Sequence, residues 1–497
     1  MAGTALDLDP LFHPKSIAVV GASQSPAKIG ATMLLSILGG QFKGKVYPIN
    51  PRAKEILGIR AYGDLTQVPE DIDLAIICVA GAAVHKAVEE CLQVGVKFGL
   101  LISSGFGEVS DEGKVLEKDL AAMATRGGMR LVGPNSAGIV SSDASLCALI
   151  NALPPATGNV SMISQSGSLG SLTILMGSEQ GIGFNKFVSS GNEADLRTED
   201  FIEYLAHDSQ TRVILSFMER AAGGRRFLEV AREATEKKPL VILKGGLTAA
   251  GARAASSHTG SLAGHPVVHD AICKQTGIIQ ANTDKDLIDL AKALALSFPP
   301  RGRRIGIVTA YGGTAVITSD ACAKEGLQVP DLHEELKEEL NALLPPFWSH
   351  NNPIDITAAG LHGGDLSVLW RNSVEVLLRD DNIDALICAI PAVKGLFEMA
   401  APRIDPNILK CLQENLLVSL ASPEIKMAEA LIELKETYNK PIVGIIVGFR
   451  GQNEPEIIKL LEENGIPVYE SPPQAAQALS KMALYREYQA SLCNSLR

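Results

Sequence analysis

The 497-residue sequence lacks the features that would place it in a membrane or on a nucleic acid. No apolar segment reaches the roughly 18 residues that a transmembrane helix needs. The stretch MAGTALDLDPLFHPKS at the N-terminus has no basic region followed by an apolar run, so no signal peptide is expected. A formal net charge of −11 argues against nucleic acid or an anionic membrane as the main partner. Any anionic ligand must therefore be held by local groups.

The cysteines and glycines also lack two common functional spacings. None of the eight cysteines forms a CxxC pair, and no set of cysteines and histidines has zinc spacing, so no metal site is predicted. Reduced, mostly buried thiols in a cytoplasmic protein are expected. The first glycine-rich turn is not GxGxxG, and no acidic residue closes the strand after it. This argues against an NAD-dependent dehydrogenase.

What the sequence does contain is a regular alternation of short apolar runs and helical patterns. Hydrophobic residues make up 46% of the chain and charged residues 20%, and there are 46 glycines, as expected of an α/β protein rich in turns. The runs predict parallel sheets that are buried on both faces. A first series of runs, residues 16–23, 45–51, 73–80, 98–106 and 129–135, predicts a doubly wound domain.

Two breaks rich in proline or glycine, residues 151–159 and 297–304, divide the rest of the chain. A second series of runs covers 159–167, 184–192, 212–219 and 239–246, and a third covers 304–313, 384–392, 440–449 and 466–471. These two series echo each other, which predicts two flavodoxin-like domains of related design. We expect domains at residues 1–150, 151–299 and 300–497.

Two turns between a strand and a helix are suited to hold phosphate. In GASQSPAKIG (21–30), Gly21 allows a tight turn, Ser23 and the following amides can face a pyrophosphate, and Gly30 allows close helix packing. Lys54 can add a cation. In SQSGSLG (164–170), hydroxyls from Ser164, Ser166 and Ser168 surround Gly167, and the free N–H groups of the next helix favour an anion. The alternatives are an ordinary tight turn and an ordinary N-cap.

A histidine, His258, stands in the stretch ARAASSHTGSLAG (252–264), which is predicted to be a loop of small residues. Such neighbours allow a large anionic group or another domain to approach the ring; the alternative is a surface histidine. A neutral imidazole is a good nucleophile when a carboxylate fixes its tautomer. Glu219, at the end of the run 212–219, is the first candidate for that carboxylate, and Glu193 is the second.

Taken together, the motifs resemble those of the α subunits of ADP-forming (NDP-forming) acyl-CoA synthetases, relatives of succinyl-CoA ligase. The resemblance covers nearly the whole chain and rests on the order and spacing of GASQSPAKIG, YPINPRAKEILGIRAY, ISSGFGE, GPN, SQSGSLG, GNEAD, DFIEYLAHD, SSHTGSLAG and NPIDIT. It implies a Rossmann-like CoA-binding domain followed by two flavodoxin-like, succinyl-CoA ligase-like domains.

The resemblance also implies roles for residues. His258 corresponds to a phosphorylated histidine and Glu219 to the glutamate that orients it. The phosphoryl group would be received by Ser164, Gln165, Ser166 and Gly167 and by the neighbours of the histidine, Ser257, Thr259 and Gly260. The positions implied to contact CoA are Gly21, Ala22, Ser23, Gln24, Gly30, Pro51, Lys54, Ser103, Ser104, Gly105 and Asn135.

The implied reaction converts acyl-CoA, phosphate and ADP into a carboxylic acid, CoA and ATP through an acyl phosphate and a phosphohistidine. No segment reads as an ATP-grasp domain. The chain is therefore expected to need a separate ATP-grasp β subunit, in an αβ or α2β2 assembly, which would bind ATP or ADP with Mg²⁺. The acyl group, the choice between ADP and GDP, and the physiological direction are not readable from the sequence.

Some positions depart from the family pattern. VAGAAV (79–84) replaces the usual VPA, Leu247 stands where an arginine is frequent, and residues 309–316 match loosely. The departures at Leu247 and at residues 309–316 suit an alternative function, a non-catalytic CoA-binding sensor or scaffold. The complete SSHTGSLAG stretch argues against that alternative, because a sensor has no use for a nucleophilic histidine.

Overall fold

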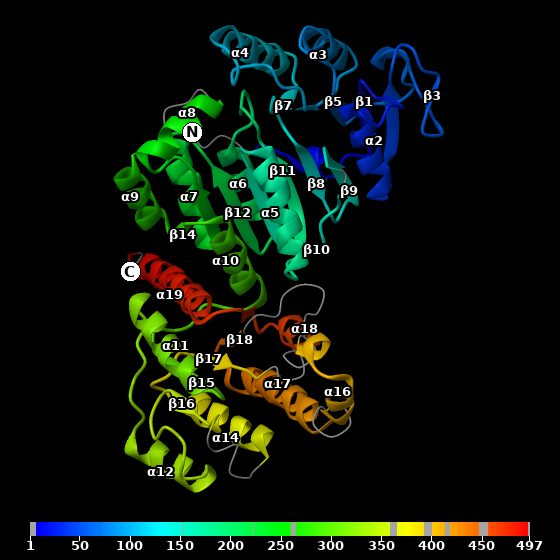
Figure 1. The fold of residues 1–497 in the computed structure, drawn as a ribbon. Coiled ribbons are helices and arrows are strands. Elements are labelled where there is room, and N and C mark those ends of the chain that lie inside the picture. The colour runs from blue at the N-terminus through cyan, green and yellow to red at the C-terminus, as the bar shows by residue number, and fades with distance from the viewer. Residues whose placement is uncertain are drawn as a thin grey trace. The chain divides into compact units, whose positions relative to one another are not determined.

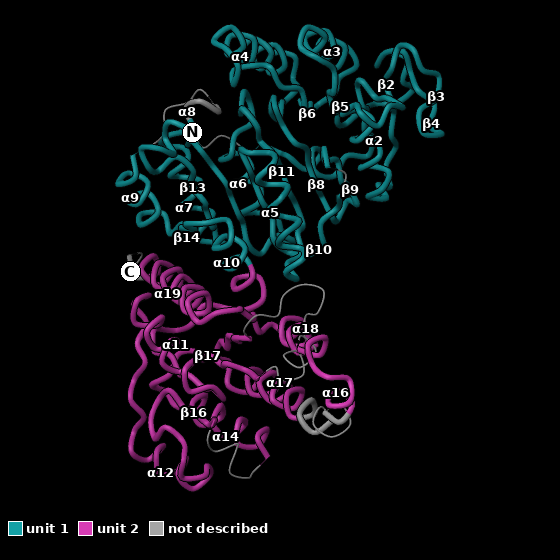
Figure 2. Tube along the Cα trace, viewed as in Figure 1, with its two compact units in different colours: residues 1–291 teal, residues 292–497 magenta. Residues whose placement is uncertain are grey.

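The structure is a computed structural model, and it divides the chain into two compact units. These are residues 1–291 and residues 292–497, teal and magenta in Figure 2. The structure describes residues 6–151, 153–221, 223–259, 265–357, 365–391, 400–412, 418–446 and 456–495, with side chains omitted at 256–259, 411–412, 418–422 and 494–495. In these ranges no helix is both long and apolar enough to cross a bilayer.

The first sheet is entirely parallel, with the strand order β2-β1-β5-β6-β7. Its strands are β1 (Ser16–Val20), β2 (Lys45–Ile49), β5 (Leu74–Ile77), β6 (Phe98–Leu101) and β7 (Arg130–Val132), with helices α2 (Ile29–Gly39), α3 (Ala83–Gln93) and α4 (Asp111–Arg126) between them. A small antiparallel pair, β3 (Glu55–Ile56) and β4 (Ile59–Arg60), and a 3₁₀ helix, η1 (Leu65–Gln67), follow β2. Each predicted run of the first series contains one of the five strands, and its remaining residues form the turn.

The second sheet repeats this order and adds an antiparallel hairpin, giving β14-β13-β12-β10-β11-β8-β9. Its parallel strands are β10 (Thr157–Ser164), β11 (Phe184–Ser189), β12 (Val213–Met218), β13 (Leu240–Lys244) and β14 (Ile279–Ala281), and its hairpin is β8 (Gly138–Ser141) and β9 (Leu146–Leu149). The helices are α5 (Gly167–Glu179), α6 (Thr198–His207), α7 (Arg225–Lys237), α8 (Ala249–Thr259), α9 (Pro266–Thr276) and α10 (Asp284–Leu296). Figure 1 shows β8 and β9 extending this sheet.

The hairpin is where sheet membership differs from the predicted boundary at residue 150. Residues 138–149 belong by sequence to the first predicted domain, but β8 pairs with β11 of the second sheet. The reason is that both hairpin strands are fully buried and complete the edge of that sheet. The division into domains at residues 150 and 299 remains a prediction.

The second unit contains a third sheet with the same topology, β16-β15-β17-β18-β19, all parallel. Its strands are β15 (Ile305–Thr309), β16 (Ile354–Asp355), β17 (Ala385–Ala389), β18 (Ile442–Ile445) and β19 (Val468–Tyr469). The helical elements are α11 (Gly312–Lys324), α12 (Glu334–Leu343), α14 (Leu366–Arg379), η2 (Ala401–Arg403), α16 (Pro406–Leu412), α17 (Val418–Tyr438), α18 (Glu456–Glu463) and α19 (Pro472–Ser495). Numbered along the chain, the parallel strands of each of these three sheets run 2-1-3-4-5. This order confirms the flavodoxin-like design that was predicted for the second and third sheets.

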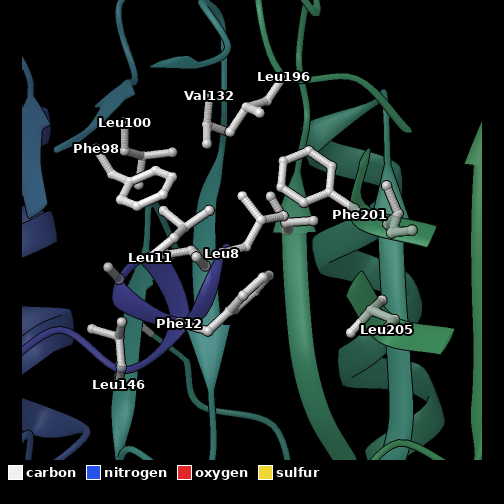
Figure 3. Packing of buried hydrophobic residues seen from close by; sticks show 14 of the residues in the cluster. Leu8, Leu11, Phe12, Phe98, Leu100, Val132, Leu146, Leu196, Phe201 and Leu205 are labelled. Carbon is white, nitrogen blue, oxygen red and sulfur yellow. The ribbon is translucent and has the colours of Figure 1, made fainter. Parts of the chain in front are cut away.

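A short N-terminal helix, α1 (Asp9–Phe12), packs the first and second sheets together. Leu8, Leu11 and Phe12 are fully buried. Figure 3 shows them between side chains of the first sheet, including Phe98 and Leu100, and side chains of α6, including Phe201. Burial of such aliphatic and aromatic side chains contributes roughly 1.5–3 kcal/mol each. The two sheets of the first unit therefore share one apolar core.

A buried lysine on β11 stabilises the same region. Lys186 is 1% exposed, and its Nζ lies 3.1 Å from Oδ2 of Asp143 and 3.1 Å from Oδ2 of Asp208. Asp143 also accepts hydrogen bonds from His13 and Ser141. Burial raises the pKa of Asp143, but these bonds and the charge of Lys186 outweigh it and bring the pKa to about 2.

We expect Asp143→Asn to lower the free energy of unfolding at neutral pH by about 1–2 kcal/mol. The folded-state pKa is depressed, so the carboxylate stabilises the fold above its unfolded pKa of about 3.9, and this contribution is lost as the pH falls towards about 2. Urea unfolding at about pH 7 and about pH 3 measures the free energy of unfolding of the variant and of wild type. The difference between these two free energies should be smaller at the lower pH. Asp111→Asn, at an exposed pair with Lys114, is the control and should change stability little. A gap that is the same at both pH values would contradict the assignment.

Candidate active site

The residues predicted to contact CoA gather at one edge of the first sheet, around the carboxyl ends of its strands. The strand order reverses direction between β1 and β5, which is the position where open α/β sheets bind ligands. Gly21, Ala22, Ser23 and Gln24 follow β1, Gly30 lies in α2, Pro51 and Lys54 follow β2, Ser103, Ser104 and Gly105 follow β6, and Asn135 follows β7. The structure thus brings the predicted set together, and contact with CoA remains a prediction for each member.

Two glycines set the shape of the first turn. Gly21 has φ +89°, and a Cβ there would lie 2.9 Å from Cγ1 of Val79. A Cβ on Gly30 would lie 2.1 Å from the carbonyl oxygen of Gly21. Only glycine fits at both positions, so α2 begins directly against the end of β1. This confirms the packing part of the prediction for Gly30.

Several predicted side chains in this region are already used by the protein. Nε2 of Gln24 donates to the carbonyl oxygen of Glu55 at 2.8 Å, and Oγ of Ser103 donates to the carbonyl oxygen of Val79 at 2.5 Å. Oγ of Ser23 accepts from the amide of Ser25 at 3.1 Å. These bonds shape the turns. Exposed groups on the same edge, among them Lys54 and Ser104, are open to a ligand.

In the second sheet, the strand order reverses between β10 and β12, and a hydrogen-bonded junction lies there. Oε1 of Gln165, just after β10, accepts from the amide of Glu219 at 2.7 Å and from the amide of Arg220 at 3.0 Å, just after β12. Nε2 of Gln165 donates to the carbonyl oxygen of Arg220 at 2.8 Å. All three bonds use the side chain of Gln165. This residue therefore holds the predicted phosphate turn against the predicted orienting glutamate.

The N-terminus of α5 opens from the same turn. Ser166 is its N-cap, and its Oγ accepts from the amide of Leu169 at 3.4 Å, while Oγ of Ser164 donates to the carbonyl oxygen of Ser166 at 2.6 Å. A Cβ on Gly167 would lie 2.5 Å from Cβ of Ala137, so this position needs glycine. The first amides of a helix have no acceptor within the helix. These amides and the helix dipole favour an anion beside the turn, but phosphate binding by these residues remains a prediction.

A lysine at the end of β13 completes this edge. Nζ of Lys244 donates to the carbonyl oxygens of Glu219 at 2.6 Å and Gly245 at 2.5 Å. Burial lowers the pKa of Lys244, and the charge of Glu219 opposes that shift. Burial and the charge of Lys244 lower the pKa of His269 on α9. Sequence reasoning did not identify Lys244, although it lies in the predicted run 239–246 and ends β13, which pairs with the strand that leads to Glu219.

Glu193, the second candidate for orienting the histidine, sits in the loop after β11 and is 4% exposed. Its Oε1 accepts from Oγ of Ser190 at 2.9 Å, from the amide of Thr198 at 3.1 Å and from Oγ1 of Thr198 at 2.6 Å. Its Oε2 is buried without a hydrogen-bond partner among the residues that the structure describes. One oxygen of Glu193 is therefore committed to the start of α6, where Thr198 is the first residue.

The stretch around His258 differs from its prediction. Residues 252–259 were expected in a loop, but they form the last two turns of α8. The physical reason is the five alanines at positions 249–255, which favour a helix more than any other residue. Residues 260–264, including Gly260, and the side chains of Ser257, His258 and Thr259 lie outside the described part of the chain. Their predicted roles remain predictions.

A polar network that sequence reasoning also missed links the two edges. Nδ2 of Asn192 donates to Oε2 of Glu108 at 2.6 Å and to Glu117, and the amide of Gly105 donates to Oε1 of Glu108 at 2.5 Å. Burial raises the pKa of Glu108, but the bonds from Asn192 and from amides lower it more, so it lies below its usual value. Both GNEAD and SGFGE were noticed as motifs, but their contact across the two sheets is not visible in the sequence.

Comparisons with known proteins match this architecture. The model of a CoA binding domain matches residues 15–142, that of a succinyl-CoA ligase like flavodoxin domain matches 157–294, and that of a ligase-CoA domain matches 305–422. The chain is 38% identical over 475 residues to the α subunit of acetate–CoA ligase (ADP-forming) II of Pyrococcus furiosus, covering 95% of this chain and 96% of that one. The chain belongs to the family of ADP-forming acetate–CoA ligase α subunits.

Further relatives support the assignment of this chain to the family. The α subunit of acetate–CoA ligase (ADP-forming) I of Pyrococcus furiosus is 38% identical over 491 residues, covering 98% of this chain and 99% of that one. A solved structure, the dinucleotide-forming acetyl-coenzyme A synthetase 1 of Candidatus Korarchaeum cryptofilum in complex with phosphate and ADP, aligns with a TM-score of 0.83 at 35% identity, covering 99% of each chain. The predicted fold class and family are thereby confirmed, and the non-catalytic alternative is not favoured.

Proposed function

We propose that this chain is the catalytic α subunit of an ADP-forming acyl-CoA synthetase. The observation that carries the proposal is the junction between Gln165 and the Glu219–Arg220 turn at the point where the second sheet reverses its strand order. This junction joins a helix N-terminus that can receive a phosphoryl group to a carboxylate that can orient an imidazole. The names of the relatives support the same activity.

The first half of the proposed reaction uses the edges of both sheets. CoA lies at the carboxyl edge of the first sheet, with its thioester towards the second. An oxygen of inorganic phosphate attacks the thioester carbonyl, the C–S bond breaks, and CoA leaves as the thiol. The product is an acyl phosphate beside the N-terminus of α5. The proposed substrate is acetyl-CoA, because the relatives are named for acetate.

In the second half, a ring nitrogen of His258 attacks the phosphorus of the acyl phosphate. The P–O bond to the acyl group breaks, the carboxylic acid leaves as its anion, and the phosphoryl group stays on the histidine. Glu219 accepts a hydrogen bond from the other ring nitrogen, which fixes the tautomer and stabilises the positive ring. A phosphohistidine carries about two negative charges, which the amides of α5 and small flanking residues such as Ser257 and Thr259 can accommodate.

A separate subunit completes the proposed cycle. The relatives are named α subunits, which implies a β subunit. We propose that this partner has an ATP-grasp site where ADP, with Mg²⁺, takes the phosphoryl group from His258 to form ATP, in an αβ or α2β2 assembly. A cytoplasmic location is also proposed; it is supported by the seven described cysteines, which are all free thiols.

The half-reaction on this chain provides the test. Purified chain is incubated with acetyl-CoA and radiolabelled orthophosphate, and both protein-bound label and released CoA thiol are measured. We expect an acid-labile, base-stable label that maps to His258 and a matching release of thiol. Free CoA in place of acetyl-CoA is the control and should give no label. If acetyl-, propionyl- and aryl-CoA all bind but none produces label, the chain is a CoA-binding sensor and the proposal fails.

A further inference from the structure

Arg220, which neither the sequence motifs nor the proposed mechanism uses, links the segments on either side of the central strand of the second sheet. Its backbone lies directly after β12, and its Nη2 donates to the carbonyl oxygen of Asn192, in the loop after β11. Strand β10 lies between β12 and β11 in the sheet. The bond therefore joins the segments that follow the two strands on either side of β10, and the loop after β11 also bonds to the end of β10 through the amide of Ser190 and the carbonyl oxygen of Ser164. The side chain of Gln165 bonds to both the amide and the carbonyl oxygen of Arg220, so Arg220 is anchored beside the turn that leads from Ser164 into α5.

The guanidinium keeps most of its hydrogen-bonding capacity in this position. Apart from the bond to Asn192, its N–H groups find no acceptor among the described residues, although an arginine has several donors in a planar fork. No carboxylate of the described chain forms an ion pair with it, whereas Arg130 and Arg226 in the same unit are paired with Asp195 and Asp200. Arg220 is only partly exposed. A half-buried cation that has no counter-ion within the described ranges is suited to bind an anion.

We propose that Arg220 binds the phosphoryl group at the carboxyl end of β10, first as inorganic phosphate and then as acyl phosphate. This inference rests on the proposed function. The planar fork of the guanidinium matches two phosphate oxygens, and the amides at the start of α5 donate from the other side of the turn. In a chain with a net charge of −11, such a local cation is what allows a phosphate to remain beside Glu219.

A purely structural role is the competing explanation, because the bond to Asn192 also ties the loops after β11 and β12 together. The two explanations differ in which substrate is affected. A phosphate contact changes the dependence of labelling on phosphate concentration and leaves the dependence on acetyl-CoA unchanged. A structural tie changes both dependences and lowers the thermal unfolding midpoint.

The test measures the initial rate of label transfer to the full chain over a range of orthophosphate concentrations. We expect Arg220→Gln to raise the half-saturating phosphate concentration by about 10- to 100-fold, the effect of losing a charge-assisted bidentate contact, and Arg220→Lys to recover part of the loss. The half-saturating acetyl-CoA concentration should not change. Arg225→Gln is the matched control, since Arg225 is 91% exposed and paired with Glu229 on α7, and it should behave as wild type.

A second measurement uses the wild-type chain and so does not depend on a variant that folds. Phenylglyoxal modifies arginines, and peptide mapping should show that inorganic phosphate protects Arg220 but not Arg225. The inference is overturned if wild-type protein is labelled at His258 while Arg220 is not protected, or if Arg220→Gln keeps the wild-type phosphate dependence. Absence of any label on the wild-type chain would instead contradict the proposed function.

Discussion

His258→Asn is expected to abolish phosphate transfer to this chain completely. With acetyl-CoA and labelled orthophosphate, the variant should show no protein-bound label above background, and no ATP should form when the β subunit and ADP are added. The reason is that the asparagine amide nitrogen has no available lone pair, so it cannot attack the phosphorus as an imidazole nitrogen does. Acetyl-CoA binding should stay within about twofold of wild type, because the predicted CoA residues lie on the first sheet.

A second histidine in the same region gives a matched control. His265 lies seven residues further along the chain and is the N-cap of α9, where its side chain accepts from the amide of Val267 at 3.3 Å. Asparagine is also a good N-cap, so His265→Asn preserves the start of the helix. Labelling of this variant should equal that of wild type. Label that persists in His258→Asn, or that maps to His265, would remove His258 from its proposed role.

Glu219→Gln is expected to slow labelling by roughly 10²- to 10⁴-fold while acetyl-CoA binding and stability stay near wild type. Glutamine keeps the size of the side chain, and the backbone bonds of residue 219 to Gln165 and Lys244 are retained. What is lost is the negative charge that fixes the histidine tautomer and stabilises the ring as it becomes positive. Single-turnover labelling at saturating acetyl-CoA and phosphate measures this effect.

Glu193→Gln distinguishes the two candidate carboxylates. Its Oε1 accepts hydrogen bonds from Ser190 and Thr198, so the variant should lose about 1–3 kcal/mol of unfolding free energy. Its labelling rate, measured on folded protein, should remain within a few-fold of wild type. The opposite pattern, with slow labelling in Glu193→Gln and normal labelling in Glu219→Gln, would make Glu193 the residue that orients His258.

Much of the fold could be predicted because parallel strands buried on both faces are continuous apolar runs. The run SIAVV forms β1 and the run VILSFM forms β12, and every residue of both strands is buried. The polar residues that follow each strand form the turns at the edge of the sheet. Short elements escaped prediction. Strands β14 and β16 lie outside the predicted runs, and β8 and β9 pair antiparallel, outside the alternation of parallel strands and helices that the prediction followed.

The stretch around His258 shows how local composition can mislead. Serine and glycine near the histidine suggested a loop, whereas the alanines before it extend α8 through residue 259. The partners of Asn192 were equally invisible, since Glu108 and Glu117 lie 84 and 75 residues away along the chain.

By itself, the sequence determined the repeated α/β design, the positions of the turns and the residue types able to bind phosphate or carry it. These depend on local apolar patterns and on glycines that permit particular backbone angles. Only the tertiary structure decided that Gln165 holds Glu219 and Arg220, that Lys244 bonds to Glu219 at the same edge, and that Arg220 donates to Asn192. Such contacts are set by the order of strands in the sheet, which brings together residues that are 25 to 55 positions apart in the chain.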